Sequence, residues 1–241
     1  MLQAHSADPR GLEQGGVSVE LMESARRVIQ QRTRGLHGVL EPLVEIKDGD
    51  KLVVELPGVK DADSAARLLS SSGTLEFYYL KDVQNANNPM GRWRMEPAMT
   101  EDKGYLFTDT RGQIIDSIKQ PVEVLAKVVR SSENKPILSG QDLLPNAKAN
   151  LNRRNQTVIN IEFNREGTGI FREFTRTHVG DYLAVFFDGR LITAPSINEA
   201  IPSGKAEITG FRSLAEARRT AEVINSGGLP VGLKVISKER L

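Results

Sequence analysis

The sequence contains no cysteine, and this absence removes several kinds of chemistry at once. Without a thiol, the chain forms no disulfide, carries no thiolate nucleophile and binds no zinc through sulfur. The three histidines, His5, His37 and His178, lie far apart, and none has a second histidine or a carboxylate at metal-ligand spacing. We therefore expect that the chain needs neither a metal nor a cofactor.

Long apolar runs are missing as well. The longest, Tyr182 to Phe187, has six residues, whereas a helix that spans a membrane needs about 20. Residues 1–9 lack the basic segment and the apolar segment of a signal peptide. The sequence therefore predicts a soluble chain with no membrane-spanning or secretory segment of its own.

Neither sign of charge is in excess. Lys and Arg number 32 and Asp and Glu number 31, which gives a net charge of +1. A nucleic-acid-binding protein usually carries surplus positive charge that attracts phosphates, so we expect no nucleic-acid partner. Apolar residues make up 39% of the 241 residues and charged residues 26%, as in an ordinary globular protein of one large or two small domains.

Both ends of the chain are strongly patterned. The first part predicts an amphipathic helix, a hairpin turned by Asp48-Gly49, a helix capped by Asp61 and a strand, over residues 20–34, 40–56, the residues after 61, and 74–81. The last part predicts a strand, a helix, a hairpin turned by Asp188-Gly189, a strand, a capped helix and a strand, over residues 157–164, 166–178, 181–194, 205–209, 214–224 and 231–238. Between them the pattern is weak, with short strands possible at 105–108, 113–118 and 122–130.

This order of elements favours the α+β class. Helices alternate with hairpin-connected strands in both patterned parts, which is typical of antiparallel sheets covered by helices on one face. The sequence therefore predicts two ferredoxin-like subdomains, each built from an antiparallel sheet and helices.

Catalytic motifs are scarce. The chain has no Gly-x-Ser-x-Gly motif, and Gly167-Thr168-Gly169 lacks the third glycine of a dinucleotide-binding loop. Two other functions are compatible with a ferredoxin-like fold. An RNA-binding module would use Tyr78, Tyr79 and Trp93, and an acylphosphatase-type enzyme would need an arginine and an asparagine around a phosphate, which the sequence does not locate.

Several segments, in order, resemble the SecD family of the bacterial Sec protein-export translocase. In the first part these are residues 25–32, 38–44 and 52–61, including Val-Glu-Leu-Pro-Gly-Val. In the last part they are residues 138–143, 163–177, 183–195, 208–211, 228–231 and 235–240, including Asp188-Gly189 followed by Ala194-Pro195. On this resemblance the chain is similar to the first periplasmic domain of that family.

The resemblance implies a base subdomain into which a head subdomain is inserted. It places the base at residues 20–83 and 229–241 and the head at residues 136–228. Residues 1–19 are expected to be a disordered lead-in, and residues 84–135 a connecting segment of uncertain structure.

The resemblance also implies a function. The chain would be the non-enzymatic periplasmic domain of a bacterial inner-membrane protein, anchored through flanking helices absent from this sequence. It would bind translocating unfolded preprotein and assist late export driven by the proton-motive force, with SecF and SecYEG as partners. The alternative is a ferredoxin-like RNA-binding or general protein-interaction module.

Two sets of residues follow from this implied role. An apolar cleft in the head is expected to contact the client, using some of Ile170, Phe171, Phe174, Phe186, Phe187 and Ile197. Of the two adjacent phenylalanines, which point to opposite sides of a strand, one is expected in the core. The head is expected to swing on two connectors, formed by Asn134, Lys135 and Pro136 and by Gly227, Gly228, Leu229 and Pro230.

Overall fold

The computed structural model describes residues 2–5, 17–36, 38–99, 104–116, 119–129 and 135–238. The chain divides into two compact units. Unit 1 combines Met1–Gly73 with Glu222–Leu241, and unit 2 is the stretch Thr74–Ala221 between them. One unit is thus inserted into the other along the chain.

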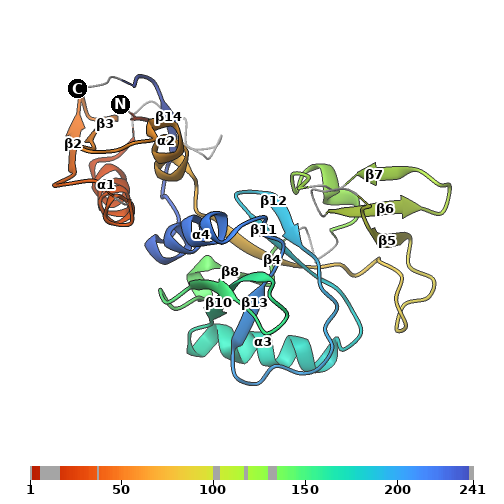
Figure 1. Ribbon diagram of the computed structural model, residues 1–241. Coiled ribbons are helices and arrows are strands. Elements are labelled where there is room, and N and C mark those ends of the chain that lie inside the picture. Colours follow the sequence, from red (N-terminus) through yellow and green to blue (C-terminus); the bar gives the residue numbers. More distant parts are fainter. Residues whose placement is uncertain are drawn as a thin grey trace. The chain divides into compact units, whose positions relative to one another are not determined.

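Unit 1 is a ferredoxin-like sandwich. Its elements are β1 (Leu2–His5), α1 (Val19–Arg34), β2 (Leu43–Lys47), β3 (Lys51–Glu55), α2 (Ala62–Ser70) and β14 (Gly232–Val235). All neighbouring strands are antiparallel, in the order β14-β1-β3-β2. The helices α1 and α2 contact each other, and each contacts the sheet (Figure 1). This βαββαβ arrangement buries the apolar stripes of both helices against strands.

Local signals place the helices and turns of unit 1 where the sequence predicts them. Ser18 caps α1 through a hydrogen bond from the Leu21 N–H at 3.3 Å, and Met22, Ala25 and Ile29 form its buried stripe. In the hairpin of β2 and β3, Asp48 and Gly49 both have positive φ, 53° and 79°. This left-handed backbone is the conformation that an Asp-Gly turn supplies.

The N-terminal lead-in expected at residues 1–19 contains a strand instead. Residues 2–5 form β1, which lies in the middle of the sheet and pairs with β14 and β3. A four-residue strand is too short to show an alternating pattern, and its partner β14 lies at the other end of the chain. The expected disorder is therefore wrong for β1, while residues 6–16 lie outside the described part of the chain.

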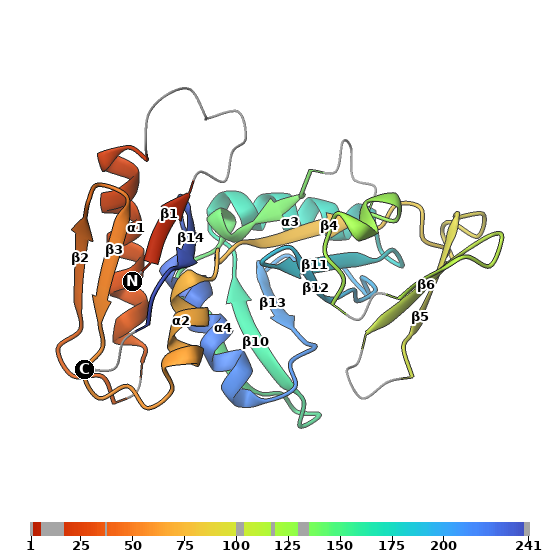
Figure 2. The ribbon, with the colours of Figure 1, turned by 90° about the horizontal axis from the view of Figure 1, so that it is seen from above.

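The described residues of unit 2 form three sheets. The four-stranded sheet β12-β11-β4-β8 lies beside the three-stranded sheets β13-β10-β9 and β5-β6-β7. The strands are β4 (Leu75–Tyr79), β5 (Trp93–Pro97), β6 (Tyr105–Asp109), β7 (Ile114–Asp116), β8 (Leu138–Ser139), β9 (Lys148–Leu151), β10 (Thr157–Glu162), β11 (Leu183–Phe187), β12 (Arg190–Thr193) and β13 (Lys205–Ile208). The helices are η1 (Val124–Lys127), η3 (Gly140–Asp142), α3 (Arg165–Thr177) and α4 (Leu214–Ser226), which ends in unit 1. Figure 2 shows α3 lying along β4.

The strand β4 lies in unit 2 and not in the base, where it is expected. The family resemblance assigns residues 20–83 to the base, but β4 pairs with β11 and β8 in unit 2. The α+β class is confirmed, yet unit 2 does not form a single ferredoxin-like sheet, because its described strands lie in three sheets, and β11 pairs with β4. Its partner β11 is distant in sequence, so local pattern does not reveal the pairing.

The described residues of the uncertain segment 84–135 have regular structure. They form the sheet β5-β6-β7 and the short helix η1. The sequence predicts a strand at residues 122–130, but Leu125, Val128 and Val129 are buried at spacings of three and four, which suits a helical turn. These residues pack around Trp93 and Phe107.

The two faces of the sheet of β4 and β11 have different surroundings. On one face, Tyr78, Ala184 and Phe186 join the core around Trp93 and Phe107. On the opposite face, Phe77, Leu183 and Val185 border a cleft, as the two-residue alternation of a strand requires. Unit 2 therefore has a packed core on one side of this sheet and an open hollow on the other.

Candidate functional site

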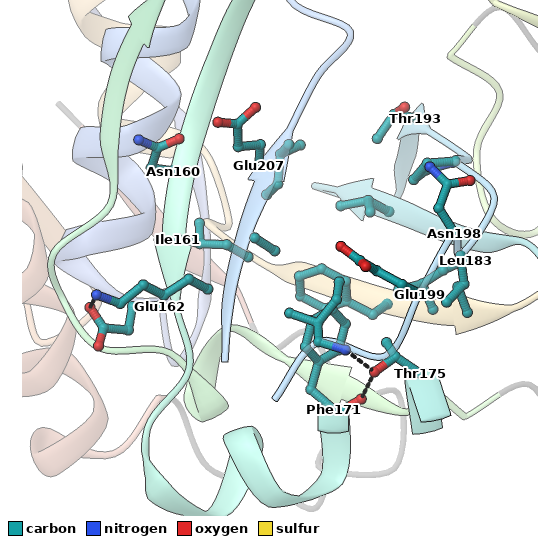
Figure 3. A pocket seen from close by; sticks show the side chains of 18 of the residues that line it. Asn160, Ile161, Glu162, Phe171, Thr175, Leu183, Thr193, Asn198, Glu199 and Glu207 are labelled. Carbon is teal, nitrogen blue, oxygen red and sulfur yellow. Dashed lines mark hydrogen bonds and ion pairs between the residues drawn. The ribbon is translucent and has the colours of Figure 1, made fainter. Parts of the chain in front are cut away.

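The cleft of unit 2 has a volume of about 770 Å³. It lies between the sheet β13-β10-β9 and the sheet β12-β11-β4-β8, with α3 along its base. Figure 3 shows Ile161, Phe171 and Leu183 around the same hollow, each from a different element. Its size is in the range of binding pockets.

The floor of the cleft is apolar and fixed by aromatic packing. Phe163 lies between two rings that border the cleft, 5.4 Å from Phe77 and 4.7 Å from Phe171 between ring centroids. Phe77, Phe171 and Ile161 are each at most 3% exposed. A floor of this kind favours apolar side chains of a ligand through contact area and does not depend on one specific hydrogen bond.

One wall is the segment 195–201, which hydrogen bonds hold in place. The Ile197 N–H donates to the Asp181 carbonyl at 2.8 Å, and the Leu183 N–H donates to the Pro195 carbonyl at 3.0 Å. The buried Thr175 hydroxyl accepts from the Ile201 N–H at 2.9 Å and donates to the Phe171 carbonyl at 2.8 Å (Figure 3). The wall is therefore preformed, so a ligand need not order it.

The other wall is the strand β13, all four residues of which border the cleft. Polar side chains lie along it and along β10. Glu162 accepts from the Asn146 amide at 3.1 Å and lies 4.0 Å from the Lys205 ammonium. Asn160 lies beside Glu207, and its Oδ1 is the one buried side-chain polar atom without a partner in the described residues (Figure 3). The sequence did not single out these polar residues, because the cleft joins strands from two sheets.

The structure brings together only part of the expected client-contact set. Phe171 and Ile197 border the cleft, and both are buried. Phe186 is fully buried on the other face of its strand, 5.4 Å from the ring of Tyr78, whereas Phe187 is half-buried. The expectation that one of these two phenylalanines is core holds for Phe186, which therefore cannot touch a ligand in the cleft.

The remaining two residues of that set, Ile170 and Phe174, do not border the cleft. Ile170 is 39% exposed on α3. Phe174 stacks on His178 at 4.2 Å and meets the ring of Tyr79 at 5.5 Å. Residues four apart on a helix share a face, so Phe171 and Thr175 face the cleft while Phe174 and His178 lie on an adjacent face.

The cluster around Tyr79 is structural. Its hydroxyl donates to Asp181 Oδ2 at 2.8 Å. Burial, followed by this hydrogen bond, raises the pKa of Tyr79, so the phenol keeps its proton and holds the residue that anchors the cleft wall. His178 joins this cluster through ring contacts with Tyr79 and Phe174.

The expected connectors do not coincide with the places where the chain crosses between units. The chain crosses once after Gly73 and once after Ala221, and the second crossing lies inside α4. Lys135 and Pro136 belong to unit 2, the stretch 227–230 belongs to unit 1, and Asn134 lies outside the described residues. In unit 1, the Leu229 N–H donates to the Ser72 carbonyl at 2.7 Å, so the two chain segments near the crossings run side by side there.

Of the three aromatic rings that favour an RNA-binding module, two are buried. Tyr78 and Trp93 are 5% and 7% exposed, and the indole N–H of Trp93 donates to the Lys127 carbonyl at 3.1 Å. Buried rings cannot stack on bases. The described residues contain no group of three or more His, Cys, Asp or Glu side chains placed to hold a metal ion. In the same part of the chain, no helix has the length and apolar character of a membrane span.

Two family models match the chain. The model described as SecDF, P1 head subdomain, matches residues 119–231. The model described as the N-terminal part of the P1 domain of protein translocase subunit SecDF matches residues 22–82. The second match includes β4, although β4 pairs with strands of unit 2.

Individual relatives agree with these models. SecDF of Thermus thermophilus is 34% identical over 216 residues, which are 89% of this chain and 27% of that protein. SecD of Acidaminococcus fermentans is 30% identical over 210 residues, 87% of this chain and 37% of that protein. The chain thus spans well under half of these relatives.

Solved structures give the same result. A crystal structure of SecDF in a super-membrane-facing form has a TM-score of 0.69 and 31% identity, and the match covers 98% of this chain and 29% of that one. A second structure, of a membrane component SecDF that enhances protein export, has a TM-score of 0.67 and 29% identity and covers 100% of this chain and 98% of that one. The chain belongs to the SecD and SecDF family of protein translocase subunits, of which it carries the P1 domain with its N-terminal and head subdomains.

Proposed function

We propose that this chain binds extended, unfolded segments of exported polypeptides in the cleft of unit 2, without catalysing a reaction. The observation that carries this proposal is the cleft itself, a preformed hollow of about 770 Å³ with an apolar floor and polar rims. Family membership supports it, because a related structure is described as a component that enhances protein export.

The composition of the cleft suits an unfolded client. Apolar contact with Ile161 and Phe171 stabilises the binding of clients of many different sequences, since burial of apolar area is non-directional. The rim carries four charged side chains, those of Glu162, Glu199, Lys205 and Glu207. Glu162 and Lys205 lie 4.0 Å apart as an ion pair. An apolar floor with a charged rim supports the binding of extended segments.

For the whole protein we propose the role that its family suggests. The domain would lie on the periplasmic side of the bacterial inner membrane, tethered by helices outside this sequence, and would act with SecF and SecYEG late in export driven by the proton-motive force. Unit 2 would swing relative to unit 1. We place the pivot near the crossings after Gly73 and after Ala221, rather than at Lys135 and Pro136.

The binding proposal is tested with a single fluorescent label, since the chain has no cysteine of its own. Asn198→Cys, on the exposed rim of the cleft, carries an environment-sensitive dye. Arg153→Cys, in the exposed turn between β9 and β10, is the matched control. A permanently unfolded, carboxymethylated polypeptide should change the signal at 198 in a saturable way and leave the signal at 153 unchanged. An equal response at both positions, or none at 198, contradicts the proposal.

A further inference from the structure

The strand β13 is an edge of its sheet, and this edge faces the cleft. In the order β13-β10-β9, β13 has β10 as its only sheet partner in the described chain. Figure 3 shows Glu207 of β13 between Asn160 of β10 and the residues of the opposite wall, Asn198 and Glu199. The edge of a sheet presents main-chain donors and acceptors that can pair with another extended segment.

The register shows which groups of β13 point toward the cleft. The Phe163 N–H donates to the Gly204 carbonyl at 2.8 Å, just beyond the end of the ladder. Because hydrogen-bonded pairs alternate along antiparallel strands, Ala206 and Ile208 bond to Ile161 and Ile159. The main-chain groups of Lys205 and Glu207 therefore point away from β10.

Of these outward groups, those of Glu207 are available. The Lys205 N–H donates to Ser203 Oγ at 3.4 Å. At the other end, Thr209 Oγ1 lies 3.2 Å from Thr193 Oγ1 of β12, which limits that end of the edge. The N–H and C=O of Glu207 have no hydrogen-bond partner among the described residues. This residue thus offers a donor and an acceptor side by side.

We propose that the client segment binds by strand addition to β13, with its main chain paired to Glu207. This proposal rests on the proposed function and specifies how the same cleft holds its ligand. Main-chain pairing gives affinity that is independent of side-chain identity, which an exporter of many sequences needs. The charged side chains of Lys205 and Glu207 and the short length of β13 deter pairing between folded copies.

Strand addition also predicts which segments bind. Alternate client side chains would lie on the face of Ala206 and Ile208, which is the face of Ile161 and the apolar floor. The side chains between them would lie on the face of Glu207 and Asn160, which is polar. We therefore expect a preference for extended segments in which apolar and polar residues alternate.

A proline at position 207 separates strand addition from side-chain contact. Glu207→Pro removes an N–H that β10 does not use, and proline is tolerated on the outward side of an edge strand. Glu207→Ala removes the same side chain but keeps the N–H, so it is the matched control. A fluorescein-labelled peptide of alternating valine and serine, with lysines at its ends for solubility, is titrated against each variant by anisotropy.

We expect Glu207→Pro to weaken binding by about tenfold or more, because a hydrogen bond is lost and the ring obstructs the edge, and Glu207→Ala to change it less than about twofold. Two further peptides carry N-methyl groups on alternate residues, one on the valines and the other on the serines. Only one of the two should lose affinity, because only one set of N–H groups faces β13. Strand addition is wrong if Glu207→Pro binds the peptide as tightly as the unchanged protein does, and if neither methylated peptide loses affinity, while the dye at Asn198→Cys still responds. The cleft then binds through side chains. If no peptide changes the dye signal at 198, the proposed function itself is contradicted.

Discussion

The side chain of Arg32 shows how a single residue can join distant parts of unit 1. It lies in the last turn of α1 and is 1% exposed. Its guanidinium donates to Ser226 Oγ and to main-chain carbonyls at the ends of α2 and α4, those of Leu68, Leu69, Ser71 and Gly227. These acceptors lie next to the two places where the chain leaves and re-enters unit 1. Gly73 has no room for a side chain there, because a Cβ would come within 2.5 Å of this guanidinium.

Replacement of Arg32 should destabilise unit 1 strongly. Arg32→Met keeps the apolar stem but leaves buried carbonyls without donors, and each such group costs about 1–3 kcal/mol. We expect a loss of roughly 3 kcal/mol or more in the free energy of unfolding of unit 1, measured by hydrogen exchange. Arg34→Met, on the exposed face of the same turn, should change it by less than about 0.5 kcal/mol. Equal effects of the two substitutions would contradict this account of the Arg32 contacts.

Glu76 of β4 is a partly buried carboxylate whose charge is costly. Burial is the main cause that raises its pKa above the ordinary 4.5, and a hydrogen bond with Tyr78 opposes the shift. Burial, with the nearby charge of Glu76, raises the pKa of Tyr78 to about 12. The folded state thus binds the Glu76 proton more tightly than the unfolded state, and stability falls as the pH rises from 4.5 through the raised pKa.

Glu76→Gln should therefore raise the thermal midpoint at neutral pH, because it removes a charge that burial penalises. The gain should disappear well below pH 4.5, where the native carboxyl is protonated. Glu173→Gln provides the opposite case, since Arg176 lowers the pKa of that exposed carboxyl. This substitution should not raise the thermal midpoint at neutral pH. Thermal melts followed by circular dichroism at both pH values test this, and a gain that is independent of pH would refute the assignment.

At the scale of elements, β11 separates the core of unit 2 from the cleft. Phe186 faces the core that contains Trp93, and Leu183 and Val185 face the cleft. Phe186→Ala should cost about 3–5 kcal/mol, as expected for a large aromatic ring removed from a packed core. Phe187→Ala should cost clearly less, because this side chain is only half-buried. Fluorescence of Trp93, the chain's single tryptophan, follows unfolding, and a larger loss for Phe187→Ala would contradict the assignment of the two faces.

The elements that the sequence predicts correctly are those with local signals. Asp61 caps α2 through a hydrogen bond from the Ser64 N–H at 2.9 Å, and Asp188-Gly189 joins β11 and β12 with both φ angles positive. The misplaced elements, β1 and β4, depend on partners far along the chain. A capping residue acts within one turn, whereas strand pairing is decided by tertiary packing.

The cleft follows the same rule. Phe171 and Ile197 could be named from their apolar character, but the edge of β13 could not. Its availability depends on which side of β13 pairs with β10 and on the fact that β12 lies in another sheet. No local pattern contains that information. For the same reason, the sequence does not show which of Phe186 and Phe187 lies in the core, whereas the structure buries the ring of Phe186.

At the scale of the whole molecule, the proposed swing predicts motion between two units that are rigid in themselves. Spin labels at Glu45→Cys in β2 and Arg172→Cys in α3 lie on exposed positions, one in each unit. Electron–electron resonance in the isolated domain should give a broad or multiple distance distribution for this pair. A pair within unit 2, Arg153→Cys with Arg172→Cys, should give a narrow one. Distributions of equal width would contradict the swing.

The measurement that tests the central claim most directly is cross-linking in the full-length protein during export. A photoreactive amino acid replaces Asn198 on the cleft rim or, as the control, Arg172 on the outer surface of α3. With an export intermediate arrested partway across the membrane, we expect the client to cross-link at position 198 and not at position 172. Cross-linking at 172 alone, equal cross-linking at both positions, or none at 198 would contradict the proposal that the cleft of unit 2 holds the emerging polypeptide.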